Sequence, residues 1–126
     1  MADSSGFVPG QHGIDAYGSG GFKFAGMSHR GSILALPTGV HAFAATCFAE
    51  ITAETLAPLL ALPRGAVDLL LVGTGPDLVP LAEPLRAQLR AAGIRSDPMA
   101  TGAAARTYNV LLGEGRRVAA ALVAVG

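Results

Sequence analysis

The chain has 126 residues, of which 51% are hydrophobic and 14% charged, with nine basic and nine acidic side chains. This length suits one domain that buries its core without a metal or a disulfide. Zero net charge provides no basic footprint for nucleic acid or an anionic membrane, and it leaves self-association into a homo-oligomer unopposed. The single cysteine, Cys47, excludes an intrachain disulfide framework and a cysteine-rich zinc site.

The start of the chain shows no targeting pattern. Residues 1–6 lack the positive charge and apolar core of a secretory signal and the Arg-rich character of a transit peptide. No apolar run reaches the roughly 18–20 residues that span a bilayer. The sequence therefore predicts a soluble cytoplasmic protein, with a flexible tail over residues 1–13 and a single domain over 14–126.

The first half of the domain consists of short apolar segments separated by glycine-rich turns. Gly18-Ser19-Gly20-Gly21 supplies positive-φ positions for one turn, and residues 26–31 are expected to form another, with His29 and Arg30 exposed. This half is therefore predicted to be a set of β-hairpins. Its strands are expected over residues 14–17 (or an extended arm there), 22–24, 32–36 and 40–48.

The second half alternates strand and helix patterns. The almost continuous apolar run 67–72 is typical of a central strand covered on both faces. The order of elements, β-hairpins followed by β-α-β-α-β, indicates an α/β domain with a mixed central sheet covered by helices. Helices are expected over residues 52–62, 80–92 with an inward stripe of Leu78, Leu81, Leu85 and Leu89, and 101–112; further strands are expected over 94–99 and 118–125.

Two loops of this second half form the candidate site. Gly73-Thr74-Gly75 leaves the carboxyl end of the apolar strand, where ligands bind in open α/β sheets. Thr101, expected as a helix N-cap, and Gly102 begin a helix whose free N–H groups can hold an anion. If strands 67–72 and 94–99 are parallel neighbours, both loops meet, and Arg106 completes a pocket for a small anion. Asn109 lies on the same helix face as Gly102 and Arg106.

The structural alternative is that the glycines serve tight turns and that Arg106 pairs with Asp68, Asp97 or a carbonyl. This alternative is favoured, because neither a nucleophile nor a base accompanies the loops and the arginine. No histidine has a second ligand at metal-binding spacing, so neither a metal nor a cofactor is expected. Cys47 is expected to be buried in its strand, roughly 20 Å along it from His41 and too far for a nucleophile pair.

Four segments carry a family resemblance, and the most specific reads Thr-Gly-Ala-Ala-Ala-Arg-Thr-Tyr-Asn at residues 101–109. Together they resemble, over roughly residues 14–124, a family of unknown-function domains. That family includes the mitochondrial complex I assembly factor 3 and uncharacterised bacterial and archaeal single-domain proteins. The segments are residues 14–24, 31–34, 70–75 and 99–116.

The resemblance implies a three-layer α/β fold with a mixed central sheet, an additional β layer and an antiparallel last strand, whereas a β-α-β connection favours a parallel one. For mitochondrial members it implies a non-enzymatic role in assembling respiratory complex I through protein partners and membrane association. It supplies no catalytic residues. Two departures are the missing transit sequence, which matches the bacterial members, and His41-Ala42-Phe43, where the family pattern has a tryptophan.

Three functions remain open from the sequence. The leading hypothesis is a non-enzymatic protein-interaction module, an assembly factor for complex I or another membrane complex, held at the inner membrane by its partners. The alternative is a small-molecule or anion-binding domain that uses residues 73–75, 101–102 and 106. An enzyme of unrecognised mechanism ranks last, because no base or nucleophile is evident.

Overall fold

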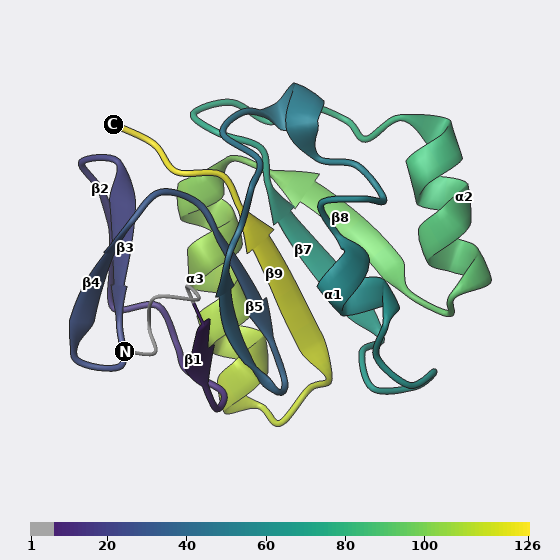
Figure 1. The fold of residues 1–126 in the computed structure, drawn as a ribbon, viewed down its shortest axis with the longest axis horizontal. Coiled ribbons are helices and arrows are strands. Elements are labelled where there is room, and N and C mark those ends of the chain that lie inside the picture. Colours follow the sequence, from purple (N-terminus) through teal and green to yellow (C-terminus); the bar gives the residue numbers. More distant parts are fainter. Residues whose placement is uncertain (1–6) are drawn as a thin grey trace.

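The computed structural model describes residues 7–126, and these residues form three layers (Figure 1). A six-stranded sheet is the central layer. Helix α3 (Thr101–Gly113) and a separate three-stranded sheet cover one face, and the short α1 (Ala57–Leu60) and α2 (Glu83–Ala91) cover the other. The predicted α/β domain with a mixed central sheet is confirmed, as is the additional β layer that the resemblance implied.

The central sheet has the order β1-β6-β5-β9-β7-β8. Strand β7 pairs in parallel with both β8 and β9, while β5 pairs antiparallel with β9. The sequence left the direction of the last strand open. That strand, β9, runs parallel to β7 and antiparallel to β5. The strands are β1 (Phe7–Pro9), β5 (Ile33–Leu36), β6 (Gly39–Ala42), β7 (Leu69–Gly73), β8 (Arg95–Met99) and β9 (Val118–Leu122).

The small sheet is an antiparallel meander of β2 (Ala16–Gly18), β3 (Gly21–Phe24) and β4 (Met27–Arg30). The turn predicted over residues 26–31 is wrong, because most of that stretch is β4. The link between β3 and β4 is only Ala25 and Gly26, and both have positive φ, of 53° and 73°. A two-residue turn of this kind matches the twist of the strands it joins.

Several other elements are shorter than predicted. The strand expected over 40–48 ends at Ala42, and the exposed Cys47 precedes the 3-10 helix η2 (Phe48–Glu50), so burial of this cysteine was a wrong prediction. The helix expected over 52–62 is reduced to α1. Hydroxyl bonds of Thr52 and Thr55 to each other and to nearby backbone hold a turn before it, and side-chain bonds of this kind compete with helix.

The N-terminal stretch also differs from the sequence expectation. Residues 7–9 lie within the predicted tail, yet they form β1 and pair with β6; residues 1–6 of that tail lie outside the described residues. Leu78, expected in the inward stripe of α2, is 57% exposed, because the helix begins only at Glu83. The helix expected over 80–92 is otherwise confirmed, with Leu85 and Leu89 buried.

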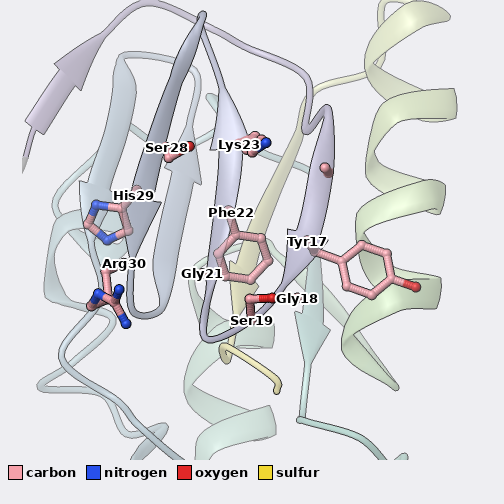
Figure 2. A pocket seen from close by; sticks show the side chains of 10 residues that line it. Tyr17, Gly18, Ser19, Gly21, Phe22, Lys23, Ser28, His29 and Arg30 are labelled. Atoms are coloured by element: carbon pink, nitrogen blue, oxygen red, sulfur yellow. The ribbon is translucent and has the colours of Figure 1, made fainter.

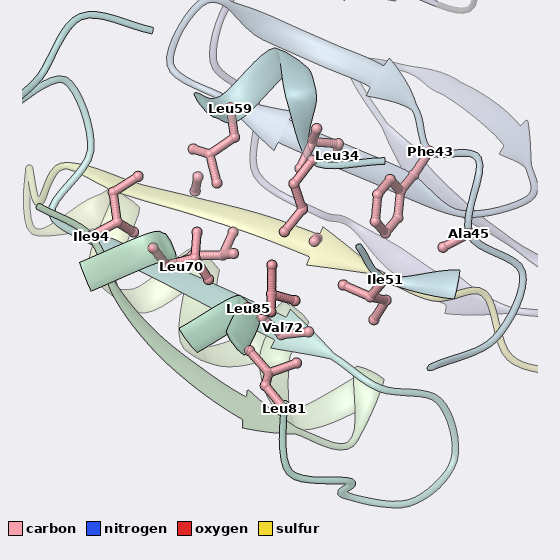
Figure 3. Packing of buried hydrophobic residues seen from close by; sticks show 14 of the residues in the cluster. Leu34, Phe43, Ala45, Ile51, Leu59, Leu70, Val72, Leu81, Leu85 and Ile94 are labelled. Atoms are coloured by element: carbon pink, nitrogen blue, oxygen red, sulfur yellow. The ribbon is translucent and has the colours of Figure 1, made fainter. Parts of the chain in front are cut away.

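Buried side chains alternate between the two faces of the central sheet. On the face of α1 and α2, Leu34, Leu70 and Val72 pack against Leu59 and Leu85 (Figure 3). The intervening residues face α3 and the small sheet, in a second core. Its members on the central sheet are Ile33, Ala35, Val40, Leu71, Val118, Ala120 and Leu122. Strand β7 is therefore the doubly covered strand that its apolar run predicted.

Tyr108 lies in this second core with its side chain fully buried. Within residues 7–126, its hydroxyl is the buried side-chain polar atom that has no hydrogen-bond partner. Burial raises the pKa of Tyr108 from 10.0 to about 12. The ring stabilises the core through its burial, but the hydroxyl costs free energy, because it loses its hydrogen bonds to water and gains none within the protein.

We expect Tyr108→Phe to leave the free energy of unfolding at neutral pH unchanged or raised by up to about 1 kcal/mol. Because the folded pKa of Tyr108 is raised, its stabilising contribution is complete below pH 10 and falls as the pH rises through about 12. By pH 11.5 the wild type should lose about 2 kcal/mol that Tyr108→Phe does not lose. Urea unfolding of both chains between pH 8 and 11.5 measures this difference, and parallel curves would contradict it.

Candidate functional site

The two predicted loops do meet at one edge of the central sheet. Because β7 and β8 are parallel neighbours, as predicted, the loop after β7 contacts the start of α3. The Thr74 N–H donates to the carbonyl of Met99 at 2.9 Å, and the Thr101 N–H donates to the carbonyl of Gly75 at 2.8 Å. The chain thus brings Gly73, Thr74, Gly75 and Thr101 together.

Thr101 joins three segments of the chain. Its fully buried hydroxyl donates to the carbonyl of Val123 at 2.7 Å and accepts from the Gly75 N–H at 3.0 Å. The prediction that Thr101 caps the helix is wrong, because the N-cap is Ala100 and Thr101 is the first helical residue. Its hydroxyl is held by the end of β9 and by the loop after β7.

Thr74 and Gly73 at this edge also make contacts within the chain. The Thr74 hydroxyl, 5% exposed, donates to the Asp77 carbonyl at 2.6 Å and accepts from the Val79 N–H at 3.0 Å. A Cβ on Gly73 would lie 2.9 Å from the Thr101 hydroxyl oxygen, so only glycine permits this close approach. These contacts support the structural role that the sequence favoured for the loop residues.

Asn109 fastens the segment before β2 onto α3. Its side-chain oxygen accepts from the Ile14 N–H at 2.8 Å, and its side-chain nitrogen donates to the Ile14 carbonyl at 2.7 Å. Gly13 lies against the same amide, where an added Cβ would come within 3.2 Å of the oxygen. One side chain therefore replaces the pair of backbone bonds that a neighbouring strand would supply.

Arg106 lies one turn further toward the helix start and is exposed. Its guanidinium donates to the Tyr17 hydroxyl at 3.2 Å. Tyr17 points from β2 toward α3 (Figure 2), and its ring occupies the space that a side chain on Gly102 would need. Arg106 does not pair with Asp68, which instead binds Arg117 at 3.0 Å, and within residues 7–126 it has no carboxylate partner.

A hollow of about 460 Å³ opens around this arginine. We call its rim the Arg106 face, lined by Ile14, Asp15, Ala16, Tyr17, Ala105, Arg106 and Asn109. The sequence put Arg106 and Asn109 on one helix face, and both line this hollow. It also expected Arg106 to complete a pocket with the loop after β7, but none of residues 73–75 lines the hollow around the arginine. Asp15 and Tyr17 were missed, because nothing in their local pattern indicates that β2 lies beside α3.

The side chains of the Arg106 face offer charged and hydrogen-bonding groups. It presents a guanidinium, a phenol, an amide and a carboxylate, and it contains no Ser, Cys or His to act as nucleophile or imidazole base. Among the described residues, no three His, Cys, Asp or Glu side chains gather as metal ligands would. No helix within residues 7–126 combines the length and apolar character that a membrane span requires.

Comparisons with known proteins agree with this architecture. The family described as protein of unknown function (DUF498/DUF598) matches residues 14–123. An uncharacterised protein of Rhodobacter capsulatus is 49% identical over 110 residues, covering 87% of this chain and 82% of the relative.

Two solved structures share the fold along nearly their whole length. One, described as an outer membrane protein from Bartonella henselae, has a TM-score of 0.89 and 49% identity and covers 94% of this chain and 98% of its own. A protein from Rhodopseudomonas palustris has a TM-score of 0.82 and 46% identity, covering 99% of this chain and 93% of its own.

We expect Thr101→Val to lower the free energy of unfolding by about 2–3 kcal/mol, because it leaves the Gly75 N–H and the Val123 carbonyl without partners. Thr101→Ser keeps the hydroxyl and removes one methyl group, so it should cost only about 1 kcal/mol. Chemical denaturation of the three chains measures the difference. Equal stability of the two variants would show that the hydroxyl does not hold this edge together.

Asn109→Ala should lower the free energy of unfolding by about 1–2 kcal/mol and speed amide exchange at Ile14, because two hydrogen bonds to that residue are lost. Val110→Ala, at a neighbouring side chain that is 59% exposed, serves as the control and should change stability little. Hydrogen exchange followed by NMR reads the Ile14 amide directly. Unchanged protection of Ile14 in Asn109→Ala would argue against the anchoring role.

Proposed function

Because the chain belongs to the family described as protein of unknown function (DUF498/DUF598), we propose that it acts as a non-enzymatic protein-interaction module whose partner binds the Arg106 face. The observation that carries the proposal is the exposed pair of Arg106 and Tyr17, with a guanidinium that has no carboxylate partner in the described part of the chain. Arginine and tyrosine are among the residues that most often dominate the energetics of protein interfaces.

The pair is also held in place before any partner arrives. Tyr17 lies against the bare backbone of Gly102, and Asn109 fixes the segment that leads into β2. Order that exists in the free protein does not have to be created on binding, so less affinity is lost to conformational entropy. This support explains why residues 102, 106 and 109 share one helix face.

We further propose that the partner belongs to a membrane complex under assembly, with respiratory complex I as the first candidate. The support is the resemblance of residues 14–124 to the family that includes complex I assembly factor 3. The description of the Bartonella henselae structure as an outer membrane protein names a different membrane. Fractionation of the two membranes therefore belongs in the experiment.

The alternative function, anion binding by the loops after β7 and β8, has less support. The Thr74 and Thr101 hydroxyls and the Gly75 N–H are engaged within the chain. The Tyr17 ring lies over Gly102, at the helix end where an anion would approach. An enzyme of unrecognised mechanism remains the third-ranked function, because the Arg106 face contains no Ser, Cys or His.

The test is affinity capture from cells that encode this chain, with separate soluble, inner-membrane and outer-membrane fractions. Arg106→Glu should reduce recovery of the captured partner at least about tenfold, because it reverses a charge in the interface. Arg95→Glu is the matched control, since Arg95 is also exposed but lies on β8 at the far edge of the central sheet.

Circular dichroism and thermal melting first establish that both variants fold as the wild type does. Equal recovery of the partner by Arg106→Glu and the wild type would contradict the proposed face. Recovery of proteins unrelated to any membrane complex would contradict the assembly role while leaving the interaction module in place.

A further inference from the structure

The outer face of the small sheet has an unusual composition. Phe22 and Phe24 are buried in the core, so their neighbours on β3 point outward. The strand register places Lys23 between Ala16 and Ser28, and Gly21 between Gly18 and Arg30. The face therefore carries two long cationic side chains on a floor of small residues.

This face is hollowed. The residues around Lys23 and Arg30 on this face are small, among them Ala16, Gly18 and Gly21, and the resulting hollow has a volume of about 490 Å³. An added Cβ on Gly18 would meet nothing within 4 Å, so the space above it is open. Ala16 and Tyr17 line this hollow and also the Arg106 face, which makes the two surfaces continuous.

The hollow is positive although the chain as a whole is neutral. Its ten lining residues include Lys23 and Arg30 and no Asp or Glu. In residues 7–126 the ion pairs involve Arg86, Arg90 and Arg117, and neither lining cation has a carboxylate within pairing distance. A concave surface with one sign of charge attracts the opposite charge.

One edge of the small sheet is free beside the hollow. Within the described residues, β4 pairs only with β3. In an antiparallel pair of strands, opposite residues alternate between hydrogen-bonded and non-hydrogen-bonded pairs. The two-residue turn makes Phe24 and Met27 a hydrogen-bonded pair, so every second pair along β3 and β4 is also bonded. The Gly31 N–H, which donates to the Gly20 carbonyl at 2.7 Å, fits this pattern. The N–H and C=O groups of Ser28 and Arg30 consequently face away from β3.

We propose that an extended, acidic segment of the partner protein adds to β4 and places its carboxylates against Arg30 and Lys23. The inference rests on the proposed function, since it names the chemistry of the partner at the surface that adjoins the Arg106 face. An added strand satisfies the free N–H and C=O groups of Ser28 and Arg30. Because side chains alternate along a strand, the segment carries Asp or Glu at every second position.

Two observations favour a protein segment over other anions. The free backbone groups of β4 alternate donor and acceptor, which a polypeptide strand matches and a phosphate does not. Of the Phe and Tyr residues that line the hollow, Phe22 is buried and the Tyr17 ring is turned toward α3, against Gly102 and Arg106, so neither offers the hollow an open ring face on which a nucleic-acid base could stack. Inorganic phosphate serves as a competitor of the peptide in the experiment, because it carries negative charge but cannot pair with the backbone of β4.

The test titrates the ¹⁵N-labelled full chain with a synthetic peptide of alternating Glu and Thr, and with a matched peptide of alternating Gln and Thr. We expect amide shifts concentrated in β2, β3 and β4 and at least about tenfold tighter binding of the Glu peptide. Lys23→Glu combined with Arg30→Glu should weaken Glu-peptide binding at least about tenfold, and Arg95→Glu should not. If the reversed variant does not fold, Lys23→Gln with Arg30→Gln replaces it.

Equal binding of the two peptides, shifts outside the small sheet, or no binding at millimolar peptide would overturn the acidic-segment proposal. Full displacement of the peptide by inorganic phosphate at an equal concentration would assign the hollow to small anions and overturn it too. The capture experiment separates the two claims. Loss of capture by Arg106→Glu together with a failed peptide titration leaves the interaction module standing and removes only its acidic partner.

Discussion

The buried hydroxyl of Thr101 is the contact on which the arrangement of this domain depends. It joins the start of α3, the loop after β7 and the end of β9. These three segments are remote in the sequence, and without the hydroxyl the Gly75 N–H and the Val123 carbonyl would be left unpaired in a dry environment. Gly73 allows the close approach that the bonds require. The residues that looked most like a ligand site thus hold the edge of the sheet together.

The cations on the exposed face of α3 and on the small sheet have a different role. Arg106 and Tyr17 bond to each other in the open, and Lys23 and Arg30 have no carboxylate partner in residues 7–126. Exposed ion pairs contribute little to stability, so leaving these cations unpaired costs the fold little. These positive charges are better explained by the binding of a partner than by a contribution to the stability of the fold.

Much of the fold could be predicted from the sequence where one segment carries its own signal. The apolar run of β7 and the helical pattern of α3 are examples. The failures fall on segments that depend on distant partners. Strand β1 forms because it pairs with β6. Strand β4 forms after a tight turn in which Ala25 has a positive φ, and alanine is not a residue from which a positive φ is predicted. At the site, Arg106 and Asn109 could be found from helix spacing, whereas Tyr17 reaches α3 only through the packing of two sheets.

The last residues of the chain hold the turn between β2 and β3, which borders the hollow on the small sheet, although they do not line that hollow. The Val125 carbonyl accepts from the Gly20 N–H at 2.8 Å, just beyond the strand that Thr101 anchors. The turn between β2 and β3 is therefore tethered by the last residues of the domain. By thermodynamic linkage, whatever orders that turn also orders the C-terminus, and whatever pulls on the C-terminus loosens the turn. A fusion placed there would act on the hollow from a distance.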